Sequence, residues 1–77
     1  MGVDGQAIER EPVESEAIYS IGYDARTQTL DIEFSNESIY RYYSVPEDVY
    51  TRFMESDSKG KFFNASILEK YPFSAMR

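Results

Sequence analysis

Residues 29–34, TLDIEF, alternate apolar and polar side chains with a period of two, and no other pattern constrains the fold as strongly. On a half-buried strand, Leu30, Ile32 and Phe34 would share the buried face. Asp31 and Glu33 would then share the opposite, solvated face. The segment is therefore predicted to be a strand of an antiparallel sheet with one face packed on a core.

A second strand precedes it, because residues 17–24, AIYSIGYD, also alternate. Here Tyr19, Ile21 and Tyr23 would point toward the core, with Ser20 and Gly22 between them. Residues 24–29, DARTQT, separate the two strands, and an aspartate at the start of such a segment favours a turn through its side chain. The two segments thus predict a β-hairpin.

The next segment, YRYYSVP at residues 40–46, raises the question whether its tyrosines form a stacking surface or part of the core. A two-residue loop after Phe34 would place Arg41 opposite Ile32 and bury an unpaired guanidinium, which is costly. A three-residue loop over residues 35–37 instead pairs Ile32 with Tyr40 and Leu30 with Tyr42. We predict this second register, which requires a left-handed backbone at Glu37 or a neighbour.

In that register the two outer tyrosines pack inward, and their hydroxyl groups reach polar partners at the rim of the core. Arg41 then lies on the opposite face with Asp31 and Glu33, where opposite charges can meet. Tyr43 follows on the same face as Arg41. These two residues are better candidates for an external contact than the inward tyrosines, although the pattern favours an ordinary solvated sheet face over such a contact.

After Tyr43 the apolar period changes from two to that of a helix. Pro46 suits the first position of a helix, and the acids Glu47 and Asp48 suit its first turn. An apolar stripe follows at helical spacing: Val45, Val49, Tyr50, Phe53 and Met54. Ser58 is a candidate N-cap for a second short helix that ends between Asn64 and Glu69. Its buried face would consist of Phe62, Phe63 and Ile67.

The predicted fold class is therefore α+β: a three-stranded antiparallel β-meander followed by two short helices on one face, in the order β-β-β-α-α. The other sheet face would stay open. We expect residues 1–12 to be a disordered acidic N-terminal tail, residues 13–71 the folded domain, and residues 72–77 a C-terminal tail.

Composition narrows the possible functions. Cysteine and histidine do not occur among the 77 residues, so no disulfide can form and the commonest general base and metal ligand are missing. The net charge is −6, and residues 1–16, with five acids and one base, contribute −4 of it. Proteins that bind duplex nucleic acid usually carry a basic excess. We found no signal peptide or membrane-spanning run, and we expect a cytoplasmic protein without metal or cofactor.

The order and spacing of several short motifs resemble those of the KTSC domain, which is named for its occurrence at the C-terminus of some lysyl-tRNA synthetases and also occurs as a free-standing small bacterial protein. The motifs are IGYD at residues 21–24, YxY at 40–42, Val45-Pro46, and SxGxFFNxxI at 58–67. The resemblance covers residues 13–71. It departs from the family pattern at Glu37, where glycine is favoured, and at Phe62, where tyrosine is usual.

This resemblance implies a fold and a set of motif residues. We expect the role of these residues to be structural: Tyr23, Asp24, Tyr40, Tyr42, Pro46, Gly60, Phe63 and Asn64. Aminoacylation is not implied, because the synthetase itself is missing. RNA binding has been suggested for the family because one of its settings is a tRNA enzyme. A fold alone does not transmit a function.

Catalysis finds little support in the residues. The carboxylates of Asp31 and Glu33 would sit on a solvated strand face without a pocket, where they make a poor acid–base pair. The serines have no histidine to activate them. The segment ESDSKG at residues 55–60 lacks the spacing of a calcium loop, and SKGK at 58–61 lacks that of a phosphate loop. We therefore expect no enzyme.

Two binding hypotheses remain. The first is a non-catalytic module that binds an unknown protein partner or a second copy of itself, through an edge strand or through the open face with Ile39 and Tyr43. The alternative is a single-stranded RNA or tRNA-binding module, which needs a basic track beside rings on which bases stack. The candidate residues for either contact are Arg41, Tyr43, Lys59, Lys61 and Asn64.

Overall fold

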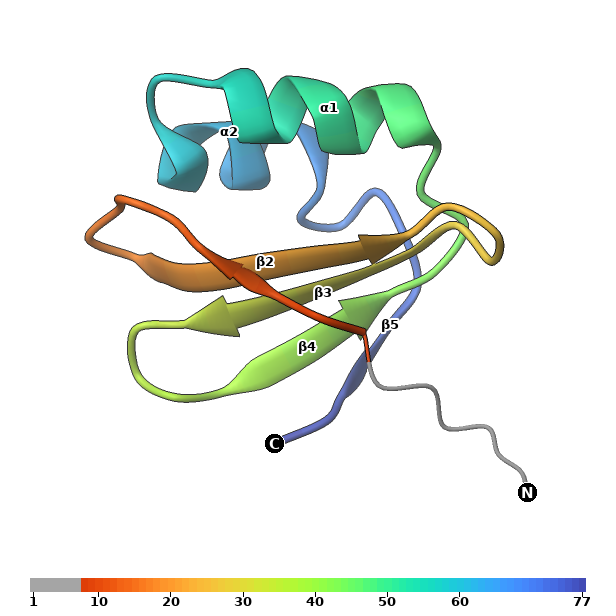
Figure 1. Cartoon of the computed structure of the whole chain (residues 1–77), viewed down its shortest axis with the longest axis horizontal. Helices are drawn as coiled ribbons and strands as arrows, with labels where there is room; N and C mark the ends of the chain where they lie inside the picture. Colours follow the sequence, from red (N-terminus) through yellow and green to blue (C-terminus); the bar gives the residue numbers. More distant parts are fainter. Residues whose placement is uncertain (1–7) are drawn as a thin grey trace.

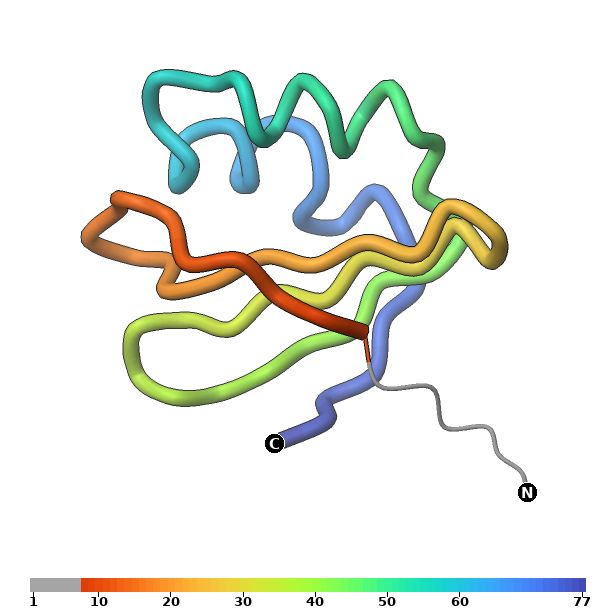
Figure 2. Tube along the Cα trace, in the orientation of Figure 1, coloured from red at the N-terminus to blue at the C-terminus, as the bar shows by residue number. Residues whose placement is uncertain are grey.

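The structure is a computed structural model that describes residues 8–77. The part of the predicted N-terminal tail at residues 1–7 lies outside the described residues. Two helices lie over one face of an antiparallel sheet (Figures 1 and 2). The elements in chain order are β1 (Glu11–Pro12), β2 (Ile18–Asp24), β3 (Thr29–Phe34), β4 (Ile39–Tyr42), α1 (Glu47–Glu55), α2 (Lys59–Ser66) and β5 (Phe73–Ala75).

The sheet has five strands in the order β1-β2-β3-β4-β5, so the prediction of a three-stranded meander was wrong in strand number. The α+β class, the central meander and the two helices on one face are confirmed. The added strands are two and three residues long and lie at the two ends of the chain (Figure 1). Strands this short show no alternation, and they exist because their backbone groups pair with β2 and β4.

The register between β3 and β4 follows the prediction. Ile32 pairs with Tyr40, Leu30 with Tyr42, and Asp31 with Arg41. Glu37 has a φ angle of 75°, in the left-handed region that the three-residue loop requires. The loop is closed by the Phe34 amide, which donates to the Ser38 carbonyl oxygen at 2.8 Å.

The core lies between the helices and the sheet. Both helices turn aromatic and aliphatic side chains toward Ile21, Leu30 and Ile32, and the fully buried members include Phe53, Val45 and Ile67. Pro46 was predicted as the first residue of this helix but is the N-cap of α1, so the helix begins one residue later, at Glu47. Ser58 is the N-cap of α2, as predicted, and its hydroxyl oxygen accepts from the Lys61 amide. The helix residues that bury apolar area are thus largely those predicted from apolar residues at helical spacing.

One face assignment on β2 was wrong. Tyr19 was expected to point into the core, but 61% of its surface is exposed, and Ile18 is buried instead. The cause is an irregularity between Ile18 and Ser20, where two residues of β2 oppose one of β3. An extra residue of this kind shifts all earlier side chains to the other face.

The second sheet face is not fully open, contrary to expectation. Residues 8–10 cross it at Gly22, where a Cβ atom would overlap the carbonyl oxygen of Glu9. Under this crossing segment, Ser20 and Asp31 are buried. Glycine at residue 22 therefore allows one backbone to lie directly on another.

An ion pair lies on this covered face. The Arg41 guanidinium donates two hydrogen bonds to the Asp31 carboxylate, at 2.8 and 2.9 Å. The side chains are only 15% and 3% exposed, respectively. The hydrogen bond from Arg41 to Asp31 raises the pKa of the guanidinium above its usual value. The sequence placed both residues on this face but did not predict that the pair would be sheltered from water.

Within residues 8–77, neither helix has the length and hydropathy needed to cross a membrane.

Gly22→Ala should lower the free energy of unfolding by about 2 kcal/mol, since the new methyl group has to displace backbone rather than a flexible side chain. The measurement is urea unfolding followed by circular dichroism. Gly60→Ala is the matched control, because a Cβ there would meet only the Ala17 methyl at 3.7 Å. Its stability should be unchanged or raised by up to about 1 kcal/mol. Equal losses in the two variants would contradict the crossing at Gly22.

Arg41→Met should lower the free energy of unfolding by about 3 kcal/mol, because it leaves the buried Asp31 carboxylate without the Arg41 guanidinium. Arg52→Met is the control: its ion pair with Asp48 is exposed, and we expect a loss of no more than about 0.5 kcal/mol. In the double variant Asp31→Leu/Arg41→Met, part of the loss should be recovered. Similar unfolding midpoints for the two arginine variants would show that the first pair is not sheltered.

Candidate functional site

The five predicted contact residues do not form one surface. Lys59, Lys61 and Asn64 line a hollow at the start of α2. Arg41 lies on the opposite face of the sheet, and Tyr43 follows β4, with 36% of its surface exposed. The sheet separates the two groups, so no single ligand surface contains all five.

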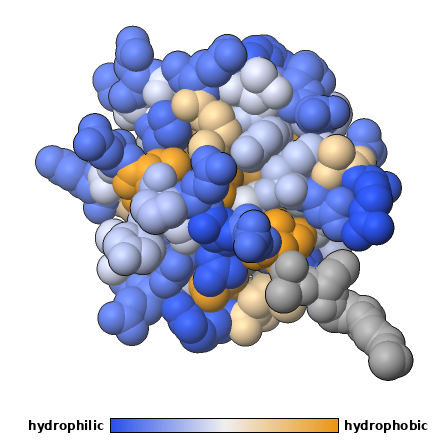
Figure 3. Space-filling view, viewed as in Figure 1, coloured by the Kyte–Doolittle hydropathy of each residue, from blue (hydrophilic) through white to orange (hydrophobic). Residues whose placement is uncertain are grey.

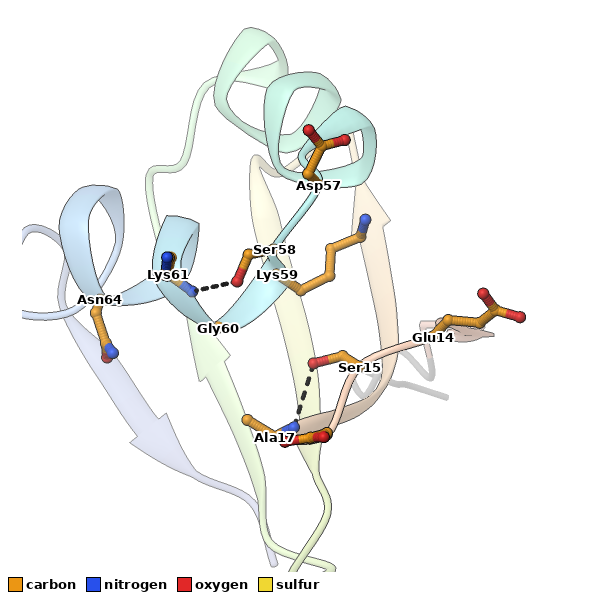
Figure 4. A pocket seen from close by; sticks show the side chains of 10 residues that line it. Glu14, Ser15, Ala17, Asp57, Ser58, Lys59, Gly60, Lys61 and Asn64 are labelled. Carbon is orange, nitrogen blue, oxygen red and sulfur yellow. Dashed lines mark hydrogen bonds between the residues drawn. The ribbon is translucent and has the colours of Figure 1, made fainter.

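The first hollow has a volume of about 410 Å³ and lies between residues 14–17 and the N-terminal turn of α2 (Figure 4). Its charge is mixed, because the acids Glu14, Glu16 and Asp57 line it together with two lysines. Glu14 and Asp57 lie on the same side as Lys59, whereas Asn64 lies at the other end (Figure 4). Three acids against two bases do not favour a phosphate group.

Three of the polar side chains in this hollow, those of Lys59, Ser15 and Ser58, form hydrogen bonds within the chain. The Lys59 ammonium donates to the carbonyl oxygen of Ser56 at 2.8 Å. The Ser15 hydroxyl oxygen accepts from the amides of Ala17 and Ile18, and the Ser58 oxygen caps α2. We call this region the polar hollow, and its visible interactions hold the segment before β2 and the start of α2 in shape.

Arg41 and Tyr43 do not form a stacking platform. The Arg41 guanidinium faces Asp31, as described above, and its charge is thereby balanced within the sheet. The Tyr43 amide donates to the carbonyl oxygen of Pro72 at 2.9 Å. This hydrogen bond joins the backbone of Tyr43 to the residue that precedes β5. These contacts indicate a structural role for Arg41 in the free protein.

A second hollow was missed by the sequence analysis. It has a volume of about 370 Å³ and lies between the end of α2 and the strands β3, β4 and β5. All six residues that line it are aromatic or aliphatic: Phe34, Tyr40, Tyr42, Phe63, Leu68 and Phe73. We call it the aromatic hollow. Because its lining carries no charged side chain, it is suited to an apolar ligand group rather than to a nucleic-acid backbone.

Ring contacts give the aromatic hollow a fixed shape. Phe63 meets Phe34 and Tyr42 edge to face, with ring centroids 5.2 and 5.8 Å apart. The ring of Phe73 is tilted against the rings of Tyr40 and Tyr42, with centroid distances of 5.5 and 5.6 Å. Edge-to-face and tilted pairs are favourable ring arrangements. Burial also raises the pKa of the Tyr42 hydroxyl above its usual value.

The rim of this hollow is more exposed than apolar residues of a small core usually are. Leu68 is 41% exposed, and Phe73 is 55% exposed. In the view of Figure 3, by contrast, most of the surface is hydrophilic and apolar residues form small separate patches. One feature of the sequence points to the rim: Phe73, a large apolar residue, directly follows Pro72 in the segment expected to be a C-terminal tail.

Two further motif residues, Tyr23 and Asp24, form side-chain contacts within the fold. The Tyr23 hydroxyl donates to the Val45 carbonyl oxygen, and its ring stacks on Tyr50 at 4.7 Å. Burial, together with nearby acids, raises the pKa of Tyr23. The Asp24 carboxylate accepts from the Arg26 amide in the turn, and hydrogen bonds from Arg26 lower the pKa of Asp24.

The carboxylates that could serve in acid–base chemistry are also engaged. Asp31 is paired with Arg41, while Glu33 accepts a hydrogen bond from the Ser20 hydroxyl at 3.0 Å and another from Arg77 at 3.0 Å. Among residues 8–77, we found no cluster of three or more acidic side chains that could hold a metal ion.

Comparisons with known proteins identify the relatives of this fold. An uncharacterized protein of Stutzerimonas stutzeri is 40% identical over 57 residues, which are 74% of this chain and 80% of that protein. A lysine–tRNA ligase of Nostoc punctiforme is 38% identical over 82% of this chain, but the match covers only 11% of the ligase.

A solved structure agrees with the fold. The crystal structure of a KTSC domain protein from Yersinia pestis superposes with a TM-score of 0.89 at 39% sequence identity, covering 92% of this chain and all of that chain. The family model of the KTSC domain matches residues 14–71. These matches confirm the resemblance inferred from the motifs, and the chain belongs to the KTSC domain family.

Proposed function

We propose that the chain is a non-catalytic binding module that holds a protein partner at the aromatic hollow. The observation that carries this proposal is the exposed rim: Leu68 and Phe73 keep about half of their surface in water above a lining without charge. Exposed apolar patches of this kind mark contact sites, and buried aromatic residues provide much of the binding energy at protein interfaces.

Two further observations support a protein ligand over a nucleic acid. The chain carries a net charge of −6, which repels a phosphate backbone. Arg41, the base expected to anchor RNA, balances Asp31 within the sheet. Since the same domain forms part of lysine–tRNA ligases, we also propose that the protein acts in the cytoplasm.

The test is protein capture from an extract of the native host with the tagged full chain. Leu68→Glu should reduce the recovered partner by at least tenfold, because a carboxylate at the rim would have to be desolvated on binding. Tyr19→Glu, a change at an exposed residue outside this hollow, should leave recovery unchanged. Circular dichroism checks that both variants are folded.

Nuclease-treated and untreated extracts are compared in parallel, with quantification by mass spectrometry. Recovery that survives nuclease and depends on Leu68 supports the proposal. Equal recovery by wild type and Leu68→Glu, or recovery abolished by nuclease, would overturn it.

Single-stranded RNA or tRNA is the second candidate, because lysine–tRNA ligases of Nostoc punctiforme and Trichormus variabilis share this domain. The bases available to such a ligand are Lys59 and Lys61 of the polar hollow, next to Asn64. Arg41→Glu is not a clean test of RNA binding, since it would break the sheltered ion pair and destabilise the fold.

The RNA hypothesis predicts that Lys59→Glu/Lys61→Glu weakens binding at least tenfold while leaving the fold intact. Fluorescence anisotropy with a labelled single-stranded RNA and a labelled tRNA, at about 50 mM salt, measures it. Glu47→Lys, a charge change on exposed α1, tests whether any response merely follows net charge. No binding at low salt would remove RNA as a ligand.

A further inference from the structure

The two edges of the sheet are protected to very different degrees. Edge β1 consists of a charged residue and a proline, Glu11–Pro12, and both residue types discourage pairing with another chain. Edge β5, Phe73–Ala75, has neither a charge nor a proline, and all three residues are exposed. In the part of the chain that the structure describes, β5 is therefore the edge open to a further strand (Figure 1).

Hydrogen bonding to β4 shows which backbone groups of β5 remain available. The Tyr43 amide donates to Pro72, and the Met76 amide donates to the Ile39 carbonyl oxygen at 2.7 Å. In an antiparallel ladder, alternate residues direct their N–H and C=O groups to the same side. Because residues 72 and 76 face β4, Ser74 does too, and the backbone groups of Phe73 and Ala75 point outward.

We propose that the strand that completes this edge is β5 of a second copy of the chain, placed antiparallel about a two-fold axis at Ser74. The inference rests on the proposed protein-binding function and names its partner. In this register, Phe73 pairs with Ala75 of the second copy, and Ala75 pairs with its Phe73. Each of these two pairs exchanges two backbone hydrogen bonds, using the groups that point outward.

Side-chain size and position make this register self-complementary. Phe73 and Ala75 lie on the helix side of the sheet, since their register partners are Tyr42 and Tyr40. In both pairs, the large ring of Phe73 therefore lies against the small methyl group of Ala75 from the other copy. The ring of Phe73 would also approach Tyr40 of the second copy, so that the two aromatic hollows join into one apolar surface across the axis.

Charge favours the same arrangement. Residues 71–76, YPFSAM, contain no ionisable acid or base other than the tyrosine hydroxyl, so no like charges meet at the axis. The acids Glu9, Glu11, Glu14 and Glu16 belong to the segment that contains β1, at the opposite edge of the sheet. A dimer through β5 thus keeps the most acidic described segments of the two copies apart.

A cysteine placed on the proposed axis tests the register directly. Ser74 would face Ser74 of the second copy as a pair without mutual hydrogen bonds, with Cα atoms about 4.5 Å apart, a separation that a disulfide can bridge. The natural chain has no cysteine, so Ser74→Cys introduces a single exposed thiol. Under mild oxidation the full chain should form a covalent dimer at least tenfold faster than Ser35→Cys, an exposed control in the β3–β4 loop.

Sedimentation velocity of the wild type over a concentration series measures self-association without a crosslink. Ala75→Pro, which removes an outward N–H group, and Ala75→Glu, which keeps the backbone and places a carboxylate against the ring of Phe73, should each weaken the dimer at least tenfold. Tyr19→Glu, which places the same carboxylate at an exposed position on β2, should leave the dimer unchanged.

A chain that stays monomeric, a Ser74→Cys variant that crosslinks no faster than Ser35→Cys, or a dimer unaffected by both Ala75 variants would each overturn the inference. These outcomes are separable from the proposed function. If a monomeric chain still captures a protein in a Leu68-dependent manner, the binding function stands and only the identity of the partner is wrong.

Discussion

The pairing of β3 with β4 determines most of what this small domain can present on its surface. With Ile32 opposite Tyr40, two tyrosines lie under the helices and Arg41 lies opposite Asp31 on the other face. A slip of one residue would exchange the two faces and bury the guanidinium among Ile21, Leu30 and Ile32. The loop reaches this register by accepting a left-handed residue at Glu37, a strain on the order of 1 kcal/mol that is small beside the cost of an unpaired buried charge.

The aromatic hollow is a consequence of that register. Tyr42 can meet Phe63 of α2 only because it faces the helices, and β5 then places Phe73 beside the rings of Tyr40 and Tyr42. Leu68 completes the rim where the chain leaves α2. Three segments that are far apart in the sequence thus build one apolar surface, while the predicted basic residues are divided between the polar hollow and the covered sheet face.

The relatives show the domain in two settings. The match covers all of the Yersinia pestis protein chain and about a tenth of the lysine–tRNA ligase of Nostoc punctiforme. A unit that occurs both alone and within an enzyme has to carry its own core, and the buried residues between the helices and sheet supply one here.

The sequence by itself determined the central hairpins, the register, both helices and the family, because each is encoded in short-range periodicity, turn residues or caps. It did not determine β1, β5, the irregularity at Tyr19 or the crossing of residues 8–10 over Gly22. Those features depend on backbone hydrogen bonds, which nearly any residue can make, and on contacts between distant segments. The candidate site belongs to the second group: Phe73 and Leu68 became surface residues of an aromatic hollow only when β5 paired with β4, and only the tertiary structure shows that pairing.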